Sequence, residues 1–115
     1  MPSTDGTRKV LLDIHVERTT QNAKWGQQNH PDGTGPYTVW VFTGPAHYVR
    51  DSAVQATNHS ADEGTITWLD ILLEEVAEAF AESDPDKLRE ELVQVAAVAT
   101  AWVEHIDRRS VSTEE

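Results

Sequence analysis

Four oxygen-bearing side chains stand in two pairs near the middle of the second half of the chain. Glu75 and Glu78 are three residues apart, and Glu91 and Gln94 repeat that spacing after a gap of twelve residues. On an α-helix, residues i and i+3 lie on one face. Two such faces, brought together, gather three carboxylates and one amide oxygen, which are ligands that hard cations prefer. The spacing therefore predicts a divalent-metal site, with Mg²⁺, or alternatively Mn²⁺, as the expected ion.

Two amphipathic helices joined by a tight turn must position these side chains. Thr67 is a suitable N-cap for the first helix, with Asp70 three residues further on. Asp84 is a suitable N-cap for the second helix, with Pro85 at its first position. The second helix repeats apolar residues at alternating three- and four-residue spacing, which are Leu88, Leu92, Val95, Ala99, Trp102 and Ile106. Such a seam indicates close helix packing, and we expect the carboxylates at the edges of the apolar faces.

The remainder of the chain gives weaker patterns. Periodic apolar residues predict helices over 7–24 and 45–62. Residues 25–43 are rich in Gly, Pro, Asn and Asp and are typical of a loop. Within it, residues 37–42 alternate in polarity and favour a short extended segment or a small hairpin arm. The expected fold class is all-α, a four-helix bundle with a long irregular loop after the first helix.

Length and composition limit the class of protein. The 115 residues are enough for one core, so we expect a single domain over 1–109 and a polar, disordered tail over 110–115. With 20 acidic against 9 basic residues, the chain is not expected to bind nucleic acid. The absence of cysteine excludes disulfides and thiolate chemistry. No membrane-spanning run and no signal-peptide pattern occur, so we expect a cytoplasmic protein that does not bind membranes.

The segment EEVAE, followed by twelve residues and ELVQ, resembles the all-α nucleoside triphosphate pyrophosphohydrolases of the MazG-like superfamily. The pattern of that superfamily is EExxE, a spacer and ExxD, and Glu74, Glu75, Glu78 and Glu91 match it. The flanking helices and the stretch ERTTQNAKWGQQNHPDG resemble small phage-type or actinobacterial-type members. The resemblance covers about two thirds of the chain. It implies hydrolysis of a canonical or modified nucleoside triphosphate to the monophosphate and pyrophosphate, by a homodimer or a dimer of dimers.

The resemblance also implies roles for individual residues. Glu75, Glu78 and Glu91 would hold the metal together with Gln94, and Glu74 would be a further ligand or the base that activates water. Glu74 and Glu75 are thus the expected catalytic residues. The substrate contacts that we expect, for the phosphates and for stacking on the base, are Gln21, Lys24, Trp25, Arg50 and Lys87.

One departure from the family pattern affects the prediction. The last residue of ExxD is Gln94 here, so the site offers three negative charges in place of four. An amide oxygen can coordinate a hard cation but brings no charge. The alternative hypothesis is therefore a catalytically impaired helical module that binds a nucleotide or a metal in a regulatory role. A plain oligomerisation bundle would explain the apolar seam but not the positions of Glu75 and Glu91.

Several of these residues also have ordinary structural explanations. Lys24 and Trp25 would anchor the end of the first helix, and Gln21 would pair with Glu17. The carboxylates would be acids at the boundary of apolar faces. The cluster of Asp107 and the two arginines that follow it would be a surface charge cluster.

Overall fold

The computed structural model describes residues 3–38 and 43–114, with side chains as far as residue 109, and it contains four helices. Their bounds are Asp5–Trp25 for α1, Ala46–Asp62 for α2, Trp68–Ala81 for α3 and Pro85–Glu114 for α4. No strand occurs in these two described stretches. The predictions of an all-α fold and of four helices near these positions are confirmed.

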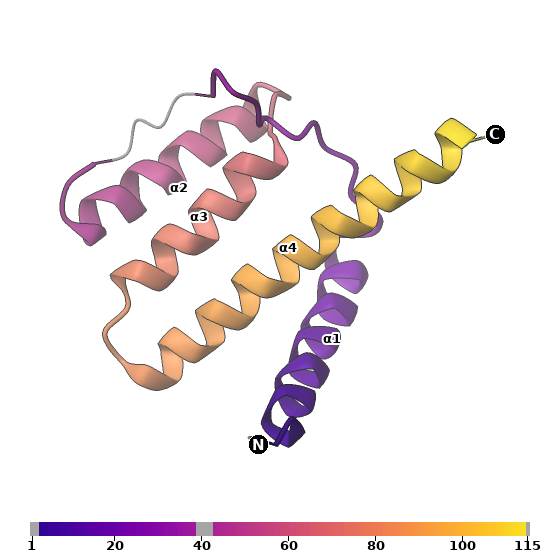
Figure 1. The fold of residues 1–115 in the computed structure, drawn as a ribbon. Coiled ribbons are helices and arrows are strands. Elements are labelled where there is room, and N and C mark those ends of the chain that lie inside the picture. The colour runs from indigo at the N-terminus through magenta and orange to yellow at the C-terminus, as the bar shows by residue number, and fades with distance from the viewer. Residues whose placement is uncertain (1–2, 39–42, 115) are drawn as a thin grey trace.

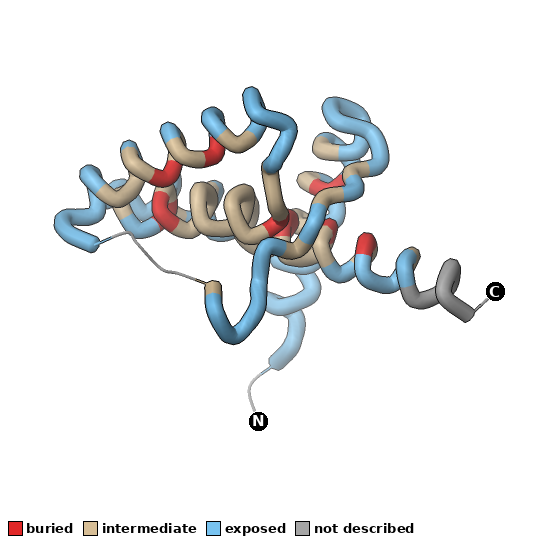
Figure 2. The backbone as a smooth tube through the Cα atoms, turned by 90° about the horizontal axis from the view of Figure 1, so that it is seen from above, coloured by how far each residue is buried: buried red, intermediate tan, exposed pale blue. Residues whose placement is uncertain are grey.

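The helices form a bundle in which each one packs against its neighbour in the order α2, α3, α4, α1. Figure 1 shows α2 and α3 side by side, with α4 continuing away from them and α1 extending from the middle of α4 toward the N-terminus. Helix α1 therefore lies at the edge of the bundle. Most of its residues are exposed along its whole length, as Figure 2 shows.

The start of α3 is fixed by the loop that follows α1. Thr67 and Asp70 form a reciprocal capping box, with both hydrogen bonds 3.1 Å long. The backbone N–H of Trp68 donates to the carbonyl of Pro31, and that of Leu69 donates to the carbonyl of Asp32, at 2.9 and 3.0 Å. The first N–H groups of a helix have no partner within the helix, and here the loop and the cap supply them. The loop thereby becomes part of the fold.

A glycine allows this close approach. Gly33 has a φ of 79°, in the left-handed region, and a Cβ atom at this position would lie 2.6 Å from the hydroxyl of Thr67. A larger residue would push the loop away from the start of α3.

The hydrophobic core is centred on Trp68. Its side chain is 1% exposed and packs with Val98 and Ala101 of α4. Three half-buried residues complete the cluster, which are Ile71, Leu72 and Trp102. Trp102, which belongs to the apolar seam predicted for the last helix, thus packs against the core as that seam predicts.

Three expectations are changed or lie outside the described residues. Helix α4 runs to Glu114, beyond residue 109, where the sequence predicts the end of the domain. Of the predicted extended segment 37–42, residues 39–42 lie outside the described residues. Several apolar positions that predicted the first helix are exposed, Leu11 and Val16 among them at about 60%. Within the described stretches, no helix is both long enough and apolar enough to cross a membrane.

Candidate metal centre

Three glutamates converge between α3 and α4. Glu75 and Glu78 project from α3 and Glu91 from α4, and one carboxylate oxygen of each lies within 4.8 Å of the others. All three side chains are half-buried. The short connection between the helices, from Glu82 to Asp84, makes them antiparallel neighbours, so the last turns of α3 face the first turns of α4. The helix spacing and the turn thus bring together the three carboxylates that the sequence singles out.

Burial and mutual repulsion act together on Glu75. Burial, followed by the negative charges of Glu78 and Glu91, raises the pKa of Glu75 from 4.5 to about 7. Smaller contributions come from Glu74 and from Glu17 of α1. Near neutral pH, this carboxyl is therefore divided between its charged and uncharged forms. A bound cation would favour the charged form.

The neighbouring glutamates share this environment. Burial is the first cause that raises the pKa of Glu74, of Glu78 and of Glu91. The charge of Glu74 further raises the pKa of Glu78, and the charge of Glu78 does the same for Glu91. A hydrogen bond with Thr57 of α2 opposes the rise for Glu74. The cluster as a whole is a set of like charges without enough compensating positive charge.

Such a cluster has the donor set of a Mg²⁺ or Mn²⁺ site. Hard cations take carboxylate oxygens and keep several waters, and half-buried carboxylates leave room for both. Gln94 follows Glu91 by three residues on α4 and is also half-buried. It is therefore on the side of the helix where a fourth ligand would stand.

Two of the expected substrate contacts are on the helices that flank or carry the cluster. The positive charge of Arg50, on α2, makes a small contribution that lowers the pKa of Glu78. Arg50 also forms an exposed ion pair with Asp51 at 3.0 Å. Lys87 is exposed in the first turn of α4, four residues before Glu91. Since i and i+4 share a helix face, Lys87 is on the same side as the metal ligands.

The other three expected contacts take part in a different set of interactions. Gln21 accepts a hydrogen bond from Nη1 of Arg18 at 3.0 Å. The ammonium of Lys24 lies 4.7 Å from the ring centroid of Trp25, which is 60% exposed. These residues occupy the C-terminal end of α1, and the structure does not bring them into the glutamate cluster.

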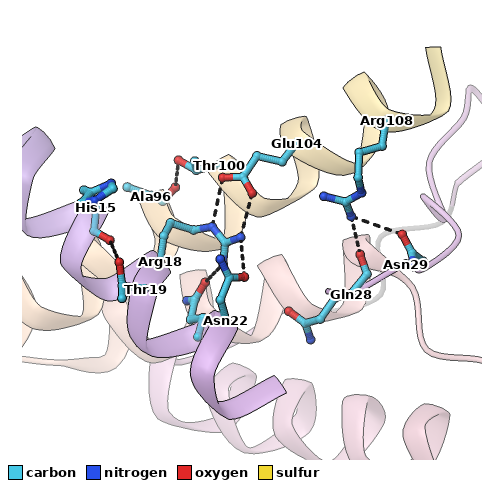
Figure 3. Close-up of polar contacts among 11 residues, drawn as sticks. His15, Arg18, Thr19, Asn22, Gln28, Asn29, Ala96, Thr100, Glu104 and Arg108 are labelled. Atoms are coloured by element: carbon cyan, nitrogen blue, oxygen red, sulfur yellow. Dashed lines mark hydrogen bonds and ion pairs between the residues drawn. The ribbon is translucent and has the colours of Figure 1, made fainter. Parts of the chain in front are cut away.

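A second polar region was missed by reasoning from the sequence. Arg18 of α1 is 9% exposed, and it donates to both carboxylate oxygens of Glu104 on α4, at 3.2 and 2.8 Å (Figure 3). Arg108, one turn further on, donates to the carbonyl of Gln28 and the side chain of Asn29. Arg109 pairs with Asp32 at 3.1 Å. The expected surface charge cluster therefore holds the loop after α1 against α4. The i,i+4 spacing of Glu104 and Arg108 indicates a charged face on α4, but it does not indicate that Arg18 is the partner of Glu104.

Comparison of the chain with models of known protein families, with curated proteins and with solved structures gives no match. What the structure defines is a small all-α protein of four helices with an acidic glutamate cluster that could hold a metal ion.

Proposed function

We propose that this protein is a Mg²⁺-dependent hydrolase that converts a nucleoside triphosphate to the monophosphate and pyrophosphate. The observation that carries the proposal is the convergence of Glu75, Glu78 and Glu91 within 4.8 Å, in a half-buried position. The reaction itself comes from the resemblance of EEVAE and ELVQ to the MazG-like pattern. Both lines of support concern the same residues.

The residues of the cluster have different roles in the proposed reaction. Glu75, Glu78 and Glu91 hold the metal, and Gln94 supplies a neutral fourth oxygen. When bound, Mg²⁺ neutralises phosphate charge and lowers the pKa of a coordinated water. Glu74 accepts the proton from the attacking water, for which its raised pKa suits it better than an ordinary carboxylate.

The water oxygen forms a bond to the α-phosphorus, and the bond from that phosphorus to the oxygen bridging to the β-phosphate breaks. Pyrophosphate leaves with the bridging oxygen and the electron pair. In this proposal, Arg50 and Lys87 contact the negative charge that collects on this leaving group. Arg50 is the better supported of the two, because its charge already acts on Glu78.

We further propose that the active form is at least a dimer. In the single chain, large apolar side chains are exposed on α1 and α4, and they include Val10, Leu11, Leu12, Val16, Leu92 and Val103. Val10 of α1 and Leu92 of α4 line a common, largely apolar hollow, and apolar surface of this kind favours contact with a second chain. Light scattering at micromolar concentration tests this, and a monomer would contradict it.

Gln94 favours a second candidate function, a regulatory module that binds a metal or a nucleotide without turnover. With three carboxylates and a neutral amide, the site attracts a divalent cation less strongly than four carboxylates would. The discriminating experiment is a screen of canonical and modified nucleoside triphosphates with Mg²⁺ or Mn²⁺. Metal-dependent pyrophosphate release from at least one of them supports the enzyme, and metal binding without release from any of them supports the module.

A further inference from the structure

A pocket at the opposite end of the α3–α4 pair has no role in the proposed reaction. It has a volume of about 190 Å³ and lies where the end of α1, the loop after it and α4 meet. Its polar lining consists of Arg18, Asn22, Gln27, Gln28, Glu104 and Arg108. Along α4, the 13 residues from Glu91 to Glu104 correspond to about 20 Å. The pocket is therefore a separate place from the glutamate cluster.

The charges of the lining do not cancel. Arg18 and Glu104 neutralise each other through two hydrogen bonds, and the arginine holds the pKa of Glu104 below its usual range. Arg108 donates to neutral acceptors, the carbonyl of Gln28 at 2.9 Å and the side-chain oxygen of Asn29 at 3.2 Å, and its charge also lowers the pKa of Glu104. Two guanidinium groups therefore share one carboxylate, and the lining carries one net positive charge in a protein whose net charge is −11.

Arg108 also has an unused donor. Its Nε is shielded from solvent and has no hydrogen-bond partner. A buried N–H of a charged group without a partner is unfavourable. A small shift of the Arg108 side chain toward a ligand in the pocket would give this N–H an acceptor. Further donors come from Asn22, because its side-chain oxygen is occupied by Arg18 at 3.0 Å while its NH₂ group is not. Figure 3 shows Arg18 and Asn22 on one side of this region and Arg108 with Gln28 on the other.

We propose that this pocket binds a phosphate group, either free phosphate or the phosphate of a small metabolite. A guanidinium with neutral amide donors beside it is a suitable receptor for an oxyanion. The volume of about 190 Å³ corresponds to about six water molecules in the liquid. That is sufficient for a phosphate group with a small remainder. The proposal does not require the glutamate cluster to hold a metal.

The test is an NMR titration of the full chain with inorganic phosphate, in EDTA and at constant ionic strength set with NaCl. We expect saturable shifts of the backbone N–H signals of Gly26, Gln27 and Gln28 and of the Nε–H signal of Arg108. The substitution Arg108→Gln should weaken binding about tenfold or more. Arg8→Gln, which removes an exposed charge from the first turn of α1, should leave it unchanged.

Circular dichroism shows whether Arg108→Gln is folded, and Arg108→Lys is the second variant if it is not, because it keeps the charge and loses the planar fork. Two further titrations, with AMP and with adenosine, identify the source of the phosphate. Competition by AMP indicates a phosphorylated metabolite, and binding of inorganic phosphate alone indicates the free ion. The proposal is overturned by the absence of saturable shifts, by binding that survives the loss of Arg108, or by adenosine shifting the same signals as strongly as AMP. Because EDTA removes divalent metals, a failure of the proposed enzymatic function would not affect any of these results.

Discussion

The two ends of the α3–α4 pair hold ionisable side chains in opposite ways. At one end, which we call the acidic end, three half-buried glutamates converge within 4.8 Å, and the pKa of each of them is raised. At the other end, which we call the paired end, Arg18 forms an ion pair with Glu104, and the pKa of the Glu104 carboxyl is lowered. Pairing stabilises the second arrangement in the folded protein, whereas repulsion destabilises the first unless a cation binds. An acidic composition that served only solubility would leave glutamates in solvent, so solubility alone does not account for the half-buried cluster.

The largest effect is expected when the acidic end is changed. Glu75→Gln and Glu91→Gln should each reduce metal-dependent pyrophosphate release by at least about 100-fold, because each removes a charged ligand. The measurement is initial rate against Mg²⁺ concentration. Asp107→Asn, an exposed acid on α4 far from the cluster, is the control and should retain the rate. Equal rates in the wild type and the three variants would show that Glu75 and Glu91 do not take part in the reaction.

At the paired end, stability rather than activity should change most. Arg18→Met leaves Glu104 without its partner, and we expect the free energy of unfolding to fall by about 2–3 kcal/mol. This is less than for a fully buried pair, because the Glu104 side chain is 43% exposed. Lys9→Met, which breaks an exposed i,i+4 pair with Asp13, should change stability by less than about 0.5 kcal/mol. Urea denaturation measures both, and similar losses in the two variants would show that burial of Arg18 adds nothing.

The raised pKa of Glu75 predicts a particular dependence of metal-free stability on pH. The unfolded carboxyl loses its proton near 4.5 and the folded one near 7, so between these values the folded state holds more protons. Stability contributed by this group is therefore present below 4.5 and is lost as the pH rises to about 7. Glu75→Gln should remove this loss and be roughly 1–2 kcal/mol more stable than the wild type at pH 8. Equal stability of the two proteins at pH 8 would contradict the raised pKa.

The smallest effect is expected when the missing fourth charge is restored to the glutamate cluster. Gln94→Asp restores a fourth charge one turn after Glu91, so we expect tighter Mg²⁺ binding and faster pyrophosphate release, by a few-fold. An inactive wild type with an active Gln94→Asp variant would identify a decayed enzyme. Similar rates would show that the amide is a sufficient ligand. If neither variant hydrolyses any nucleotide while both bind metal, the non-catalytic module replaces the enzyme.

The acidic end was predictable from the sequence because local rules determine it. Spacing of three residues places Glu75 and Glu78 on one face of a helix, and the short turn before Pro85 brings Glu91 opposite them. The capping box at Thr67 likewise follows from residues that are close in sequence. Each of these features needs only helix geometry and a tight connection.

The paired end was not predictable in the same way. Arg18 and Glu104 are 86 residues apart, and their contact depends on the angle at which α1 crosses α4. The contacts of Arg108 depend on the path of the loop after α1. Hydrophobic periodicity determines neither the angle between α1 and α4 nor the path of the loop after α1. The periodicity correctly predicts that α1 is a helix, but two of its apolar residues, Leu11 and Val16, are exposed in the single chain.

The glutamate cluster is proposed to be a divalent-cation site. The direct test is calorimetric titration of the wild type with Mg²⁺ at pH 7, carried out in two buffers of different ionisation enthalpy. Because the pKa of Glu75 is about 7, metal binding should release up to about half a proton. The measured heat should therefore differ between the buffers, and Glu75→Gln should lose most of the binding. No binding heat in either buffer at millimolar Mg²⁺ or Mn²⁺, with no rise in melting temperature, would contradict the claim.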